Sequence, residues 1–211
     1  MEPQNQIDSA SADSRGAINI ETEDRLRADL YSLLALLLAK PPEQDVLTKL
    51  QEFTGESTDI GSGVKTLAKL AGKISPKACE KEFNALFIGL GRGELLPYAS
   101  FYMTGFLNEK PLARLRQDMR AFGISRAEDV FEPEDNIASL CEMMAGLIQG
   151  SFLRPVSLQE QRDFFRTHIG PWAGHFFSDL EAAKNSVFYA PVGTIGRAFM
   201  QIESEAFRLD E

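Results

Sequence analysis

The chain has 211 residues, 44% hydrophobic and 25% charged, which is enough apolar material for one full core or for two closely packed halves. Its 22 basic and 31 acidic side chains give a net charge of −9, which argues against a nucleic-acid partner and favours basic ones. On charge alone, solubility explains the excess of acids equally well.

The first 21 residues differ from the rest because they contain few large apolar side chains. Such a segment does not offset the entropy of ordering, so we expect a flexible tail at 1–21 and a folded part at 22–211. The tail lacks the charged start and apolar run of an export signal, which predicts a cytoplasmic protein. The apolar run at 33–39 is far shorter than the roughly 20 residues that cross a bilayer and is expected to be a core helix.

Apolar residues recur at helical spacing along most of the chain, and proline or glycine ends many of the periodic stretches. The segments at 61–63 and 89–102, rich in glycine or proline, are expected to be loops, and no segment alternates like a strand. We therefore predict an all-α globular bundle of about ten helices whose two halves join near 123–136. Besides an aromatic helix that Ser75 and Pro76 open, the expected helices are 23–39, 43–53, 64–70, 110–122, 137–148, 157–169, 172–184 and 192–207.

A candidate binding surface begins in the aromatic helix, where Phe83, Leu86, Phe87 and Leu90 form one apolar face. The loop that follows, GLGRGELLPYASFY, ends with tyrosines that can stack on an arginine or hydrogen-bond a peptide backbone. A stripe of Phe and Leu at this spacing is more often core than groove. For Phe83 and Phe87 we accordingly place core packing ahead of ligand contact.

An acidic segment, Glu-Pro-Glu-Asp-Asn at 132–136, precedes the clearest amphipathic helix of the sequence. Proline suits the first turn of a helix, and carboxylates are favoured at its positive end. Exposed acids in this position can also receive arginine side chains, and we expect Asp135 and Tyr98 to be exposed. Apolar surface beside negative charge fits a basic, apolar peptide better than a small metabolite.

Patterns typical of catalysis or metal binding are missing from the sequence, which contains no HExxH, GxSxG or CxxC. A glycine and a proline separate His168 from His175, so one continuous helix cannot align them on zinc. Cys79 and Cys141 are expected to be reduced, buried thiols. The C-terminal aromatic residues are expected to form core, namely Phe164, Phe165, Trp172, Phe176, Phe177, Phe188 and Tyr189.

Four segments resemble, in their order and spacing, the TorD/DmsD/NarJ family of redox-enzyme maturation chaperones across roughly residues 23–207. They are EFNALFIG, LPYASFY, EPEDNIASLCEMMAGLI and FFRTHIGPWAGHFFSDLEAAKNSVFYAPVG. The resemblance implies a cytoplasmic all-helical chaperone rather than an enzyme. It would bind the twin-arginine signal peptide and the apo form of a molybdenum-cofactor oxidoreductase, and assist its maturation before export.

The same resemblance implies a peptide site that the aromatic helix, the loop and the acidic segment build together. The family's acidic segment usually ends in Asp-His, whereas this chain has Asp135-Asn136, which removes any role for a titratable imidazole. The implied site residues are Phe83, Leu86, Phe87, Pro97, Tyr98, Ser100, Glu132, Asp135 and Asn136, to which the stacking argument adds Tyr102.

Two other functions stay open from the sequence. One is a permanent assembly subunit of an oxidoreductase complex. The other is a switch that binds guanine nucleotide, as has been proposed in the family, although the glycine-rich loops here form no recognisable nucleotide site. We expect no metal and no other cofactor, and either a monomer or a domain-swapped dimer.

Overall fold

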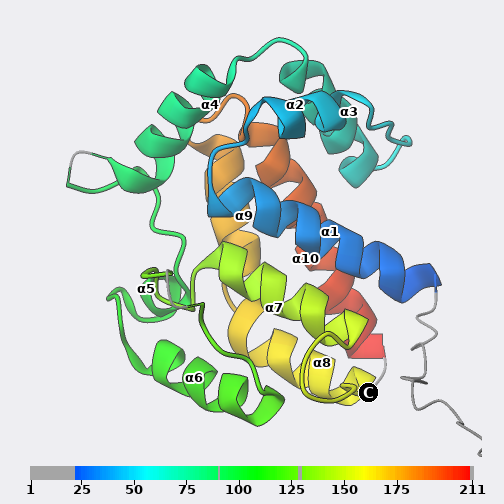
Figure 1. Cartoon of the computed structure of the whole chain (residues 1–211), viewed down its shortest axis with the longest axis vertical. Coiled ribbons are helices and arrows are strands. Elements are labelled where there is room, and N and C mark those ends of the chain that lie inside the picture. Colours follow the sequence, from blue (N-terminus) through cyan, green and yellow to red (C-terminus); the bar gives the residue numbers. More distant parts are fainter. Residues whose placement is uncertain (1–21, 90, 128–129, 210–211) are drawn as a thin grey trace, which may run out of the picture.

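The computed structural model describes residues 22–89, 91–127 and 130–209, and the expected flexible tail at 1–21 lies outside them. Within these ranges the chain forms ten α-helices, two π-helical segments and one isolated β-bridge, which confirms the all-α prediction (Figure 1). The α-helices are α1 (Thr22–Ala39), α2 (Gln44–Gln51), α3 (Asp59–Ala71), α4 (Pro76–Phe83), α5 (Ala99–Thr104), α6 (Lys110–Phe122), α7 (Ile137–Gln149), α8 (Leu158–Phe164), α9 (Ala173–Ala182) and α10 (Ala190–Leu209). The π-helical segments η1 (Asn84–Ile88) and η2 (Phe165–Ile169) continue α4 and α8.

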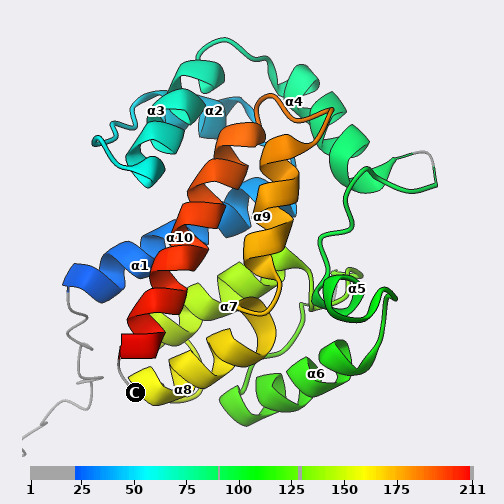
Figure 2. The ribbon, with the colours of Figure 1, turned by 180° about the vertical axis from the view of Figure 1, so that it is seen from behind.

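The centre of the molecule is built on α1 and α7, which lie side by side, while α10 packs against α9 and α3 (Figures 1 and 2). Nearly all of α7 between Ile137 and Ile148 is buried, which accounts for its apolar sequence. The C-terminal aromatic residues are also buried, as predicted. Cys79 and Cys141 are free, buried thiols, and burial, followed by the nearby Glu82, raises the pKa of Cys79 to about 12.

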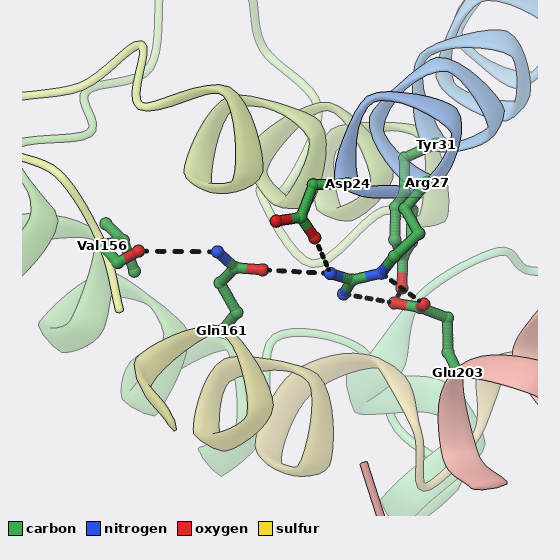
Figure 3. Close-up of polar contacts among 6 residues, drawn as sticks. All are labelled: Asp24, Arg27, Tyr31, Val156, Gln161 and Glu203. Carbon is green, nitrogen blue, oxygen red and sulfur yellow. Dashed lines mark hydrogen bonds and ion pairs between the residues drawn. The ribbon is translucent and has the colours of Figure 1, made fainter. Parts of the chain in front are cut away.

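A buried ionic network joins α1 to α10 (Figure 3). Arg27 donates two hydrogen bonds to the carboxylate of Glu203, from Nε at 2.7 Å and from Nη2 at 2.9 Å. Tyr31 donates its hydroxyl proton to the same carboxylate at 3.0 Å, and Arg27 also reaches Asp24 at 2.7 Å. Glu203 is only 1% exposed, and a buried carboxylate needs partners inside the protein. Arg27 and Tyr31 supply them.

The prediction of a loop at residues 61–63 is wrong, because these residues lie inside α3. The helix begins at Asp59 and is capped by Thr58, whose side chain accepts a hydrogen bond from the Gly61 amide at 3.0 Å. A Cβ atom on Gly63 would lie 2.7 Å from Cγ1 of Ile195, so this glycine lets α3 approach α10. Gly63 therefore serves close helix packing and does not form a turn.

The prediction of a loop at 89–102 is correct only for the residues before α5 (Ala99–Thr104). Gly89 and Gly91 have φ values of 63° and 95°, which glycine adopts without strain, so they supply the expected turn. The chain then becomes helical at Ala99, where α5 begins. Leu90, which was expected on the apolar face, lies outside the described residues.

His168 is a buried residue that contacts α6 through Asp118. It is buried in η2, and its Nε2 lies 2.7 Å from Oδ2 of Asp118. Burial lowers the pKa of His168 below its ordinary value of 6.5, and this effect outweighs the opposite influence of Asp118. The neutral imidazole is therefore favoured in the folded protein.

Candidate functional site

Two segments that the sequence analysis singled out meet at the start of α7. Tyr98 and Asn136 form an isolated antiparallel β-bridge, next to which the Ile137 amide donates to the Pro97 carbonyl at 2.9 Å. The loop before α5 is thereby held against the acidic segment. The two motifs are close in space although more than 30 residues separate them in the sequence.

Asp135 holds this junction together from the inside. Its Oδ2 accepts a hydrogen bond from the Ser100 amide at 2.8 Å, and its carbonyl accepts one from the Ala99 amide at 2.9 Å. Asp135 is only 1% exposed, so the expectation that it faces solvent is wrong. The carboxylate is turned toward the first turn of α5, where free backbone amides require acceptors. We therefore assign Asp135 to positioning the loop.

Asn136 caps the first turn of α7. Its Oδ1 accepts a hydrogen bond from the Ala138 amide at 2.9 Å. Asparagine is among the preferred residues for this position because its short side chain reaches the free amides of the first turn. The residue that stands where the family usually has histidine thus has a defined structural role.

A pocket of about 240 Å³ opens beside the junction, and we call it the hinge pocket. The end of α1, the α4–η1 segment, the 97–98 and 130–132 segments and the start of α7 form its walls. Six of the predicted site residues line it: Phe83, Phe87, Pro97, Tyr98, Glu132 and Asn136. Lining residues that the sequence analysis did not name are Leu38, Ala39, Ile88, Val130, Ile137, Ala138, Ser139 and Glu142.

The other four predicted residues do not line the pocket. Leu86, Ser100 and Asp135 are buried. Tyr102 donates its hydroxyl to Asp179 at 2.8 Å and its ring lies 5.3 Å from that of Trp172, so it links α5 to the C-terminal helices. None of these four side chains therefore lies in the lining of the hinge pocket.

The apolar wall of the pocket belongs to a larger aromatic cluster. The rings of Phe83 and Phe87 meet edge to face at 4.9 Å, and Phe87 packs in the same way on Tyr189 at 5.7 Å. Phe83 is 7% exposed and Phe87 is half-buried. Core packing therefore dominates for Phe83, as expected, while both rings still close one side of the pocket.

The ionisable residues that line the hinge pocket are Tyr98, Glu132 and Glu142, with no basic side chain among them. Both glutamates are exposed. Tyr98 donates its hydroxyl to Glu132, and burial together with this carboxylate raises the pKa of Tyr98, so the hydroxyl stays protonated. Within the described ranges Glu142 forms no ion pair. Among the described residues neither of these two carboxylates forms an ion pair. Arg126, which lines an adjoining cavity together with both, pairs with Glu134 instead.

Glu142 was missed by the sequence analysis, although a signal for it exists. It is the single charged residue in α7, whose other residues from Ile137 to Ile148 are apolar or small. A lone charge on such a helix must reach solvent or a partner, since burying it unpaired is costly. Here it reaches the mouth of a pocket.

The described part of the chain contains no group of three or more His, Cys, Asp or Glu residues that could hold a metal ion. Among the helices of residues 22–89, 91–127 and 130–209, none has the length and apolar character required to span a bilayer.

Comparisons with known proteins agree with this architecture. The family model described as nitrate reductase delta subunit matches residues 54–178. A protein named "Chaperone protein TorD" from Photobacterium profundum is 30% identical over 206 residues, covering 88% of this chain and 95% of the relative. Its namesake from Vibrio cholerae is 28% identical over 205 residues, covering 88% of this chain and 92% of the relative.

A solved structure supports the fold. It is a candidate redox enzyme maturation protein from Archaeoglobus fulgidus, which superposes with a TM-score of 0.58 at 20% identity and covers 87% of this chain and 99% of that chain. The relatives are named as chaperones and not as enzymes. The chain therefore belongs to the nitrate reductase delta subunit family, the TorD/DmsD/NarJ family of redox-enzyme maturation chaperones.

Proposed function

We propose that this chaperone binds, in the cytoplasm, the twin-arginine signal peptide of a molybdenum-cofactor oxidoreductase, and that the hinge pocket is the binding site. One observation carries the proposal: Glu132 and Glu142 line a partly apolar pocket in which no lining side chain is basic. A ligand with guanidinium groups next to apolar residues complements both properties.

Each wall has a role in this proposal. Glu132 accepts a guanidinium while Tyr98 holds its carboxylate in place. Phe83 and Phe87 exclude water from one side and contact the apolar side chains of the peptide. Asp135 acts through the loop that it fixes. Because Asn136 does not titrate, binding should not depend on a histidine at this position.

The proposed activity is binding alone, without a covalent step. A chaperone that occupies the signal peptide keeps the apo form of the oxidoreductase from export until its cofactor is inserted, and releases it by ordinary dissociation. The relatives named as chaperones support such a role.

Isothermal titration calorimetry tests the proposal directly. The full chain is titrated with a synthetic twin-arginine signal peptide and with the same peptide in which both arginines are replaced by glutamine. We expect saturable binding of the first peptide and at least roughly tenfold weaker binding of the second, since charge-assisted contacts are lost. Equal affinity for both peptides, or no binding of either to folded protein, would contradict the proposal.

A further inference from the structure

A second, larger cavity continues from the hinge pocket along the surface between α1 and α7. Its volume is about 460 Å³, and we call it the α1–α7 groove. Ala39 and Glu142 line both cavities, so the groove begins where the pocket ends. The two helices lie next to each other along this face (Figure 1).

The groove has a clear origin in the sequence of α1. This helix contributes Ser32, Ala35, Leu36 and Ala39, which follow one another at i, i+3, i+4 and i+7 and therefore lie on one helix face. Three of the four are small. The face consequently leaves a trough beside α7 that Leu36, at 46% exposure, borders on its open side.

The facing helix repeats the same spacing. Glu142, Ala145, Gly146 and Gln149 of α7 line the groove, and again only short side chains lie in the middle of the set. Phe152 packs directly on Gly146, because a Cβ atom on this glycine would lie 2.5 Å from Cζ of the phenylalanine. Two matched faces of small residues thus enclose an elongated concavity.

Charge is distributed unequally between the two cavities. The hinge pocket has two carboxylates, whereas Glu142, at the junction, is the single charged residue that lines the groove. Beyond this residue the lining is uncharged, and its polar side chains are Ser32, Gln149 and Ser151. A ligand that fits both cavities is therefore cationic at one end and apolar at the other.

We propose that the α1–α7 groove receives the apolar stretch that follows the paired arginines of the signal peptide, with Glu142 at the point where the two parts meet. This inference rests on the proposed function. It also sets the direction of the bound peptide, which runs from the hinge pocket at the C-terminal end of α1 toward Ser32. The chaperone then binds the arginines in the hinge pocket and the apolar stretch that follows them in the α1–α7 groove.

Fluorescence anisotropy with two labelled peptides tests the groove. One peptide contains the paired arginines and the following apolar stretch, and the other ends directly after the arginine motif. Leu36→Asn should weaken binding of the long peptide by roughly threefold to tenfold, because contact with one leucine side chain is lost. Binding of the short peptide should not change. Leu26→Asn is the matched control, since Leu26 is an exposed leucine of the same helix, 60% exposed, outside the groove.

A second variant is needed because Leu36 also lines a neighbouring cavity next to Pro41 and Pro42, so its substitution could act through that cavity. Ser32 is exposed and belongs to the groove alone, so Ser32→Trp should fill the groove and weaken binding of the long peptide only. Unchanged affinity of both variants for the long peptide would overturn the inference while leaving the proposed function intact. Failure of both peptides to bind the unmodified chain would overturn both. If Leu36→Asn changed self-association in sedimentation but not peptide affinity, the groove would belong to a second copy of the chain.

Discussion

Two acidic regions of this molecule treat their carboxylates in opposite ways. Beneath the surface between α1 and α10, Glu203 accepts hydrogen bonds from both Arg27 and Tyr31 (Figure 3). At the hinge pocket, Glu132 and Glu142 stand beside apolar walls with no basic side chain in the lining. The first region satisfies its charge internally, whereas the second leaves negative charge for a partner. We infer that a carboxylate paired with a cation inside the protein stabilises the fold, whereas one without such a partner is available to a cationic ligand.

The strongest test of the structural region is Glu203→Ala. It leaves the guanidinium of Arg27 largely buried without its main partner, so the free energy of unfolding should fall by about 3 kcal/mol. Urea denaturation measures the change. Glu43→Gln is the control, since Glu43 pairs with Lys40 on the exposed surface and its loss should cost at most about 1 kcal/mol. Equal losses of unfolding free energy in the two variants would mean that the buried network stabilises the fold no more than an exposed ion pair does.

Asp135→Ala tests whether Asp135 positions the loop beside the hinge pocket. The variant loses the hydrogen bond from the Ser100 amide, so unfolding free energy should fall by roughly 1.5 to 3 kcal/mol. Thermal and urea unfolding measure this loss. A variant as stable as the parent would contradict the role of Asp135 in positioning the loop.

Glu142→Gln should have the reverse profile, with stability nearly unchanged and peptide affinity reduced by about fivefold, as expected for an exposed ion pair of about 1 kcal/mol. Added salt should weaken binding by the parent chain more than by the variant. Glu80→Gln provides the control, because Glu80 is exposed on α4 away from the pocket. Similar affinities of the two variants would remove Glu142 from the site.

The smallest expected effect concerns His168 and pH. Burial lowers the pKa of this histidine in the folded state, so below pH 6.5 the unfolded chain binds a proton that the folded chain does not. Stability should therefore rise with pH through the window just below 6.5 and level off above it. Urea unfolding at pH 5.5 and 7.5 should show a smaller difference for His168→Gln than for the parent. An identical difference would exclude His168 as its source.

The sequence predicted the elements whose patterns depend on burial alone. The periodic apolar residues of α7 and the C-terminal aromatic residues indicated correctly which faces are buried. Gly63 misled the prediction because a glycine that permits close helix packing has the same local sequence as one that makes a turn.

The candidate site was harder to predict than the fold. Tyr98 and Glu132 were predicted as site residues and line the hinge pocket. The orientation of Asp135 depends on the path of the loop that it binds, which no local pattern contains. Glu142 was not predicted because it lines a pocket only once α1 and the 130–132 segment are brought against α7. Charge composition predicts the sign of the proposed ligand but not which residues would contact it.

A double-mutant cycle between Glu132 and the peptide measures whether this carboxylate pairs with an arginine of the ligand. Affinities are measured for the parent chain and Glu132→Gln, each with the twin-arginine peptide and with peptides in which one arginine is replaced by glutamine. We expect Glu132 and one arginine to be coupled by about 1 kcal/mol or more, so that the losses of affinity from the two substitutions do not add. Losses that add within roughly 0.5 kcal/mol for both arginines would show that this carboxylate does not receive the signal peptide.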